Sequence, residues 1–237
     1  MTRIALLRYP GTWSERDFEH AFALVPDVET EIVWHDDADL RGFDAAIVPG
    51  GFSYGDYLRA GAIAKLSRGT AELRRFADAG KPILGSCNGF QILCEAGLLP
   101  GALLRNVGLE YRCDWINVRV ESDRTPWTDG LGGAILRMPI GHGEGCWVAD
   151  PDTLAQVEAG GQVVFRYCDA RGAATIEANP NGSVANIAGV RNEQGNVVGL
   201  MPHPERCAEA LLGGTDGYRI LERLARVPVG TSPAVYR

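Results

Sequence analysis

Four short segments in the first hundred residues combine a run of apolar side chains with glycine, proline or charged residues at the boundary. Such short runs are typical of buried strands, because a helix needs a longer periodic pattern. The pattern predicts strands within residues 3–11, 30–36, 43–51 and 81–86.

The segments between these strands have the spacing of helices. Between residues 57 and 79, charged residues separate apolar side chains at helical intervals, and Gly80 ends the pattern. Residues 14–22 form a polar, helix-like stretch, and residues 88–97 predict a helix that Gly97 closes. Alternating strands and helices predict an α/β fold, a doubly wound and mostly parallel sheet flanked by helices.

The second half of the chain is richer in strands. Strand-like runs cover residues 115–122, 133–140, 162–168, 183–192 and 196–202. The last two are joined by a tight turn of sequence NEQGN. The last predicted helix covers 217–226 and precedes a tail, 227–237. Since the sequence has no repeat or Pro/Ser-rich linker, we expect one domain over 1–237, with its core at about 3–226.

Charge and hydropathy narrow the classes of partner. The 237-residue chain has a formal net charge of −7, which argues against nucleic acid or an anionic membrane as the main partner. Its apolar runs are shorter than the roughly 20 residues of a membrane span. The first residues lead directly into a strand-like run without a signal-peptide cleavage region, so we expect a cytoplasmic protein.

Six cysteines are spread along the chain without a C-x-x-C pair. This spacing makes a zinc site or a disulfide framework a poor interpretation, and we expect reduced thiols and no bound metal. Cys87 differs from the others because glycines and a serine surround it, in Gly85-Ser86-Cys87-Asn88-Gly89, between a predicted strand and a predicted helix.

The G-x-C-x-G sequence is the thiol form of a nucleophile elbow, a sharp turn that lifts the nucleophile out of a sheet. At a helix N-terminus the macrodipole and the free N–H groups would stabilise the Cys87 thiolate. The backbone N–H of Asn88 would face an oxyanion formed beside the sulfur. The alternative interpretation is a glycine-rich turn that carries an incidental cysteine.

A second glycine turn, Gly50-Gly51, follows the strand predicted within residues 43–51. In doubly wound sheets, the loops after neighbouring strands meet at the carboxyl edge, where ligands bind. Gly50 and Gly51 could therefore complete an oxyanion hole for Cys87, or they could form only a tight turn.

Two of the four histidines belong to His-x-Glu triplets that follow strands. His20 and His35 lie in polar stretches and are predicted at the surface. The prolines around His203 stiffen its triplet, which suits a fixed pair with Glu205, whereas Gly143 leaves His142 and Glu144 less constrained. The residues favour His203 as the base and leave His142 open.

With these motifs together, the sequence resembles the class I, or triad-type, glutamine amidotransferases. The elbow with Gln91 and the sequence PHPE at 202–205 carry this resemblance. The sequences PGGFSYGDYLRAGAIA at 49–64 and PIGHGEG at 139–145 narrow it to the glutaminase subunits of phosphoribosylformylglycinamidine synthase, as does the pair Arg105-Asn106. The resemblance extends over about residues 3–220; Gly141, where the family usually has Ala, and residues 107–111 depart from it.

The resemblance implies a flavodoxin-like amidotransferase fold and a role for each matching residue. Cys87 is the nucleophile, His203 the general base and then acid, and Glu205 orients His203. The oxyanion hole and substrate pocket are assigned to Gly50, Gly51, Asn88 and Gln91. His142 and Glu144 are assigned to the pocket edge or an interface, and residues 55–57 to the same surface.

The resemblance also implies partners. The sequence has no P-loop or kinase-type glycine loop, so ATP and Mg²⁺ are expected in a synthetase subunit, with no cofactor in this chain. That subunit would take ammonia from glutamine and convert formylglycinamide ribonucleotide to formylglycinamidine ribonucleotide, with a small bridging subunit in addition. Three alternatives remain at this stage: an amidotransferase subunit of another pathway, an intracellular cysteine hydrolase on the same fold, and a binding module without activity.

Overall fold

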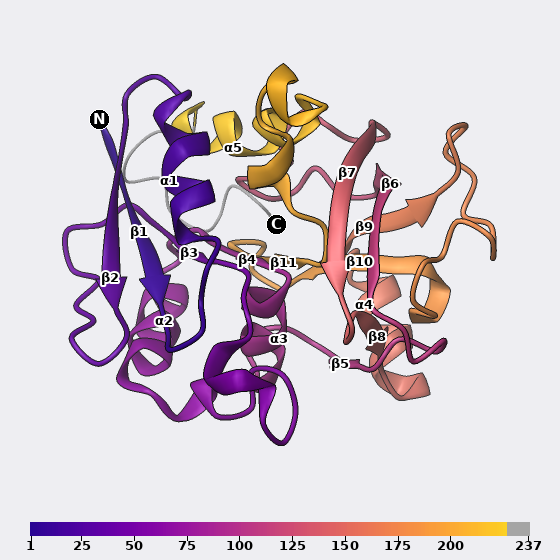
Figure 1. Cartoon of the computed structure of the whole chain (residues 1–237), viewed down its shortest axis with the longest axis horizontal. Helices are drawn as coiled ribbons and strands as arrows, with labels where there is room; N and C mark the ends of the chain where they lie inside the picture. Colours follow the sequence, from indigo (N-terminus) through magenta and orange to yellow (C-terminus); the bar gives the residue numbers. More distant parts are fainter. Residues whose placement is uncertain (227–237) are drawn as a thin grey trace.

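The computed structural model describes residues 1–226, and the predicted tail lies outside the described residues. A nine-stranded sheet runs through the molecule in the order β2-β1-β3-β4-β11-β10-β9-β6-β7 (Figure 1). The first five strands in this order pair in parallel, which confirms the predicted α/β sheet: β2 (Val28–Trp34), β1 (Thr2–Arg8), β3 (Ala45–Val48), β4 (Ile83–Ser86) and β11 (Val197–Leu200).

An antiparallel extension continues the sheet and confirms the predicted strand-rich second half. It consists of β10 (Ile187–Arg191), β9 (Val163–Cys168), β6 (Arg112–Val120) and β7 (Ile135–His142). The predicted NEQGN turn joins β10 to β11, and the side chain of Asn192 accepts hydrogen bonds from the N–H groups of Gly195 and Val197. A small second sheet pairs β5 (Ala102–Leu104) with β8 (Cys146–Val148).

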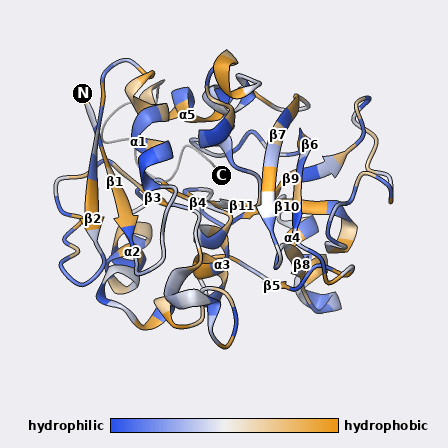
Figure 2. Cartoon of the chain, viewed as in Figure 1, coloured by the Kyte–Doolittle hydropathy of each residue, from blue (hydrophilic) through white to orange (hydrophobic). Residues whose placement is uncertain are grey.

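Helices cover both faces of the parallel half. In Figure 1, α1 (Glu15–Ala23) and α5 (Asp216–Arg226) lie above strands β3, β4 and β11, and α2 (Arg68–Asp78) and α3 (Asn88–Glu95) lie below them. Neighbouring residues of β1 therefore enter different cores: Leu6 packs with the α1 side and Leu7 with the α2 and α3 side. This two-sided burial explains why β1 is hydrophobic along most of its length (Figure 2).

The prediction of a helix over residues 57–79 is wrong for the first half of this range. Only α2 is an α-helix, and Ser67 caps it by accepting a hydrogen bond from the N–H of Thr70. The preceding residues form a loop with short 3-10 turns, η1 (Ser53–Asp56) and η2 (Ala64–Leu66). A Cβ on Gly61, where φ is +80°, would lie 2.7 Å from the backbone nitrogen of Ile92, so close packing on α3 replaces the helix.

Sequence analysis missed helix α4 (Pro151–Ala159). Its signal was nevertheless present, because Asp150 accepts hydrogen bonds from the N–H groups of Asp152 and Thr153, and Pro151 stands in the first turn. The remaining short 3-10 turns are η3 (Val184–Asn186), η4 (Pro204–Cys207) and η5 (Ala210–Leu212). The assignment of residues 1–237 to one domain stays a prediction.

Candidate active site

Cys87 lies at the sharp turn between β4 and α3, where the sequence predicted a nucleophile elbow. Its backbone is strained, with φ +50° and ψ −106°. The neighbouring glycines are required by close packing: a Cβ on Gly89 would lie 1.8 Å from the carbonyl oxygen of Val48, and one on Gly85 would lie 2.8 Å from the backbone of Gly89. The turn thus places the thiol at the carboxyl edge of the sheet and at a helix N-terminus.

His203 and Glu205 follow β11, the neighbour of β4 in the sheet. Nδ1 of His203 lies 2.6 Å from Oε1 of Glu205, and both side chains are buried. The hydroxyl of Ser86 lies 3.4 Å from Oε2 of the same carboxylate and donates to it. Burial lowers the pKa of His203, but the charges of Glu205 and of an ionised Cys87 raise it to about 10.

Gly50 lies between the histidine and the cysteine. A Cβ placed on Gly50 would lie 2.8 Å from Cε1 of His203 and 3.5 Å from Cβ of Cys87, so both side chains pack on the same glycine. The three residues follow β3, β4 and β11, which are adjacent in the sheet. Sheet topology therefore brings together the predicted nucleophile, base and glycine turn.

A hydrogen-bonded network ties the η1 loop to the start of α3. The side-chain carbonyl of Asn88 accepts from the N–H of Ser53, and its NH₂ group donates to Oε1 of Gln91 and to Oδ1 of Asp56. Gln91 in turn donates to the carbonyl oxygen of Glu144 at 2.6 Å. Asn88 and Gln91, both predicted in the pocket, thus connect the loop, the helix and the end of β7.

A cavity of about 270 Å³ opens beside the sulfur of Cys87. Five of the predicted site residues line it, Gly51, Cys87, Gln91, His142 and Glu144, whereas Gly50, Asn88, His203 and Glu205 do not. Its lining includes Gly51, Phe52, Asp56, Cys87, Gln91, Arg105, Leu109, Glu110, Tyr111, His142 and Glu144. The structure therefore places five of the predicted residues on one pocket, and the catalytic roles of the predicted residues stay predictions.

His142 forms part of the pocket wall and is buried. Its Nδ1 atom lies 3.2 Å from Oδ1 of Asn106, whose NH₂ group donates to the carbonyl oxygens of His142 and Glu110. Burial and the nearby charge of His203 lower the pKa of His142 to about 4. At neutral pH His142 is therefore uncharged, and Asn106 holds its ring.

Sequence analysis placed His20 and His35 at the surface, and only the first prediction is confirmed. His20 is exposed and pairs with Glu209 at 2.8 Å. His35 is buried, because its ring stacks on Tyr9 at 5.4 Å and also contacts Trp34. The polar neighbours Asp36 and Asp37 concealed this burial. Within residues 1–226 no cluster of metal-ligating side chains occurs, and no helix is long and apolar enough to cross a membrane.

Comparison with known proteins agrees with this geometry. The family model of the CobB/CobQ-like glutamine amidotransferase domain matches residues 1–214. The fold and the site thus define a glutamine amidotransferase.

Individual relatives show to which family of glutamine amidotransferases the chain belongs. The phosphoribosylformylglycinamidine synthase subunit PurQ of Thermomicrobium roseum is 57% identical, covering 95% of this chain and 96% of the relative. The PurQ subunit of Moorella thermoacetica is 50% identical, covering 92% and 93%. The solved structure of PurLQS from Thermotoga maritima has a TM-score of 0.84 and 42% identity, covering 95% of this chain and 98% of that chain. The chain belongs to the PurQ family of phosphoribosylformylglycinamidine synthase subunits.

Proposed function

We propose that the chain hydrolyses glutamine through a Cys87–His203–Glu205 triad and delivers the ammonia to a synthetase. As a glutamine amidotransferase of the PurQ family, it acts in the synthesis of formylglycinamidine ribonucleotide for purine biosynthesis. The observation that carries the triad is the buried 2.6 Å contact between His203 and Glu205, at the same sheet edge as the strained Cys87 turn.

The first half of the reaction forms a thioester. The Cys87 thiolate attacks the side-chain amide carbon of glutamine, and a new S–C bond creates a tetrahedral oxyanion. Backbone N–H groups of Gly51 and Asn88 hold this oxyanion; the N–H of Asn88 is available because the first N–H groups of a helix have no intrahelical acceptor. Protonated His203 then donates its proton to the leaving nitrogen, the C–N bond breaks, and ammonia departs.

The second half releases glutamate. His203, now neutral, takes a proton from water, and the resulting hydroxide attacks the γ-glutamyl thioester. The S–C bond breaks, which returns Cys87 to the thiolate and His203 to the protonated form. Glu205 orients His203 throughout and stabilises its positive charge in the protonated steps, in agreement with the raised pKa of the ring.

A synthetase partner is supported by the relatives and by the pocket rim. The Thermotoga maritima relative was solved as PurLQS. Three exposed apolar side chains line the pocket and form the apolar rim, Phe52, Leu109 and Tyr111. Tyr57 and Leu58, on the neighbouring loop, are exposed as well. Large exposed apolar patches mark protein interfaces, so the synthetase docks here and receives ammonia from the pocket.

ATP and Mg²⁺ belong to the synthetase, and a small bridging subunit completes the complex. We place the complex in the cytoplasm, because all six cysteines are unpaired, as in reducing compartments.

The proposal is tested by Cys87→Ala in the reconstituted complex. Glutamine-dependent synthesis should fall to background, whereas synthesis from added ammonium should continue, because the synthetase site is untouched. Full glutamine-dependent synthesis by this variant would overturn the triad. Loss of both activities would contradict the separation of the two sites.

A further inference from the structure

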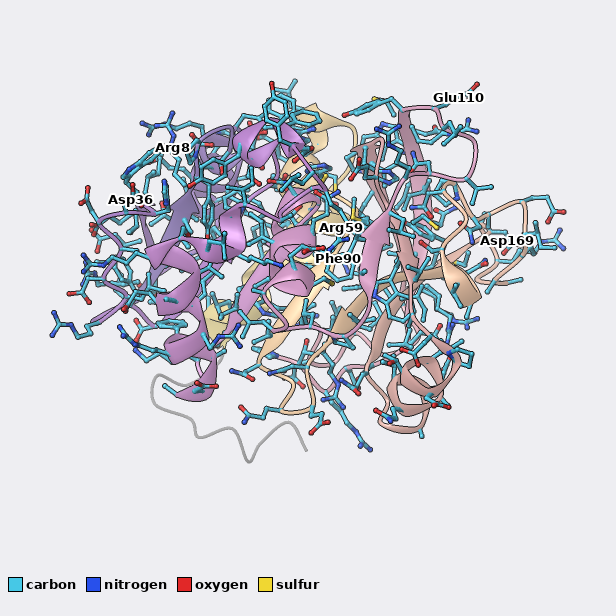
Figure 3. All side chains as sticks on the ribbon, turned by 90° about the horizontal axis from the view of Figure 1, so that it is seen from below. Arg8, Asp36, Arg59, Phe90, Glu110 and Asp169 are labelled. Atoms are coloured by element: carbon cyan, nitrogen blue, oxygen red, sulfur yellow. The ribbon has the colours of Figure 1, made fainter. Side chains whose placement is uncertain are left out.

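The catalytic pocket carries more negative charge than the proposed chemistry uses. Three carboxylates line it, Asp56, Glu110 and Glu144, against one guanidinium, that of Arg105. Glu110 lies at the periphery of the molecule, where Arg112 neutralises it at 3.5 Å (Figure 3). Asp56 and Glu144 remain inside the pocket, and the proposed triad gives neither of them a role.

Glu144 is held in place by its own contacts. One oxygen accepts a hydrogen bond from the N–H of Ala60, and the other lies 3.7 Å from Nε of Arg105. The Glu144 side chain is 23% exposed, whereas Arg105 is 77% exposed and reaches the rim. The pocket therefore has an anionic wall and a cation at its entrance.

Asp56 has no such cation. Oδ1 of Asp56 accepts a hydrogen bond from Asn88, the residue after the nucleophile, and no described cation lies within 4 Å of the carboxylate. Partial burial and the charge of Glu144 raise the pKa of Asp56 to about 6, against the smaller effect of the Asn88 hydrogen bond. The carboxylate is thus a half-buried anion that lacks a positive partner.

Buried polar atoms without a partner lie in the pocket wall and beside the Cys87 turn, where a polar ligand or the proposed proton transfer would use them. Oγ of Ser53, Nε2 of His142 and Nε2 of His203 are buried without a hydrogen-bond partner among the described residues. Native proteins pair most buried polar groups, and exceptions concentrate where a ligand or a reaction uses them.

Free glutamine has the charges that this pocket lacks. Its amide must reach Cys87, and its other end carries an ammonium and a carboxylate group. We propose that Asp56 recognises the α-ammonium group of free glutamine, with Glu144 beside it, while Arg105 faces the α-carboxylate. This inference rests on the proposed function and deepens it: the pocket accepts the free amino acid and rejects glutamine within a peptide, whose α-nitrogen is an uncharged amide.

The test compares glutamine with glutaramate, the same molecule without its α-amino group, using the chain together with its synthetase. In Asp56→Asn, kcat/KM for glutamine should fall roughly 10- to 100-fold through KM, because a charge-assisted hydrogen bond is lost. The value for glutaramate should stay unchanged, so the preference for glutamine collapses by the same factor. Asparagine suits the site because Asp56 has φ +53°, which asparagine tolerates, and its carbonyl can still accept from Asn88.

Asp36→Asn is the matched control, since Asp36 is an exposed aspartate at the edge of the molecule (Figure 3). It should leave the preference intact. An unchanged preference in Asp56→Asn would overturn the proposal, as would wild-type protein that uses glutaramate as efficiently as glutamine. Cys87→Ala, assayed in parallel, tests the triad separately, and full activity in this variant would contradict the triad. If Cys87→Ala is inactive but Asp56→Asn keeps the preference for glutamine over glutaramate, the triad stands and the assignment of Asp56 fails.

Discussion

Gly50 and His203 are in such close contact that no other residue fits at position 50 without moving the histidine ring. A Cβ would lie 2.8 Å from Cε1 of His203. We therefore expect Gly50→Ala to displace His203 and to reduce glutaminase activity by about 10²-fold, the order of loss for a small misplacement of a reacting group. The measurement is glutamate production at saturating glutamine.

Gly214→Ala is the control for this substitution. A Cβ there would meet Trp115 at 3.4 Å, an ordinary contact, so activity should persist. Wild-type activity in Gly50→Ala would show that the ring is not confined by the glycine turn.

Cys87 should react first among the six thiols with a glutamine-like electrophile. Exposure alone would favour a different thiol, because Cys113 is exposed and Cys87 is buried. A small general alkylating reagent should modify Cys113 readily, whereas the glutamine analogue should prefer Cys87, because the pocket and His203 act on that thiol alone. Mass spectrometry of both reactions checks this, and equal labelling of Cys113 by the analogue would contradict it.

Removal of the nucleophile should have a matching kinetic effect. Cys87→Ala should lower glutaminase turnover by about 10⁶-fold, the order found when a triad nucleophile is removed. Cys94→Ala, which alters a buried cysteine inside helix α3, should leave turnover near the wild-type level.

The two His-x-Glu triplets should differ in function. His203→Ala should abolish glutaminase activity with or without the synthetase, since it removes the proton carrier. His142→Ala should retain part of the thioester formation, because His142 lies in the pocket wall and pairs with Asn106 rather than with Glu205. Rapid-quench detection of the thioester distinguishes them; complete loss in both variants would contradict this division.

His142 should also make folding stability depend on pH. Its folded-state pKa of about 4 lies below the unfolded value of about 6.5, so the unfolded chain binds the extra proton between these values. The contribution of neutral His142 to folding stability is present above pH 6.5 and is lost as the pH falls towards 4. Between pH 7 and 5, wild type should lose about 2 kcal/mol more than His142→Gln.

Denaturant unfolding of both proteins at the two pH values measures this difference. The raised pKa of Asp56 makes folding stability depend on pH in the opposite direction. Because Asp56 is present in both proteins, its contribution cancels in the comparison. Parallel losses in the two proteins would show that His142 does not titrate between pH 7 and 5.

The isolated chain should be a poor glutaminase. The η1 loop holds Tyr54, Gly55 and Asp56 at positive φ, and the apolar rim beside it is exposed. Docking of the synthetase could select a minor, competent conformation of this loop; if that conformation is about 1% populated, stimulation reaches at most about 100-fold. Glutamate production with and without the synthetase and its nucleotides tests this, and full turnover by the chain alone would refute the coupling.

Sequence patterns predicted the parts of this molecule that depend on local chemistry. Gly85 and Gly89 identified the elbow around Cys87 because only small residues fit there, and the prolines around His203 marked the segment of the predicted base. Patterns failed where tertiary contacts decide: apolar Leu58 and Leu66 are exposed rather than on a helix face, and Asp56 enters the pocket through a loop whose path depends on α3.

The strained backbone of Cys87 gives the nucleophile position an evolutionary consequence. A positive φ at a residue other than glycine costs about 1–3 kcal/mol, and glycine at position 87 would relieve that strain. The proposed glutamine chemistry and the packing of the buried Cys87 side chain oppose this replacement. A descendant released from that chemistry should lose its cysteine to glycine sooner than to larger residues, and Cys87→Gly should yield an inactive scaffold for capturing the assembled complex.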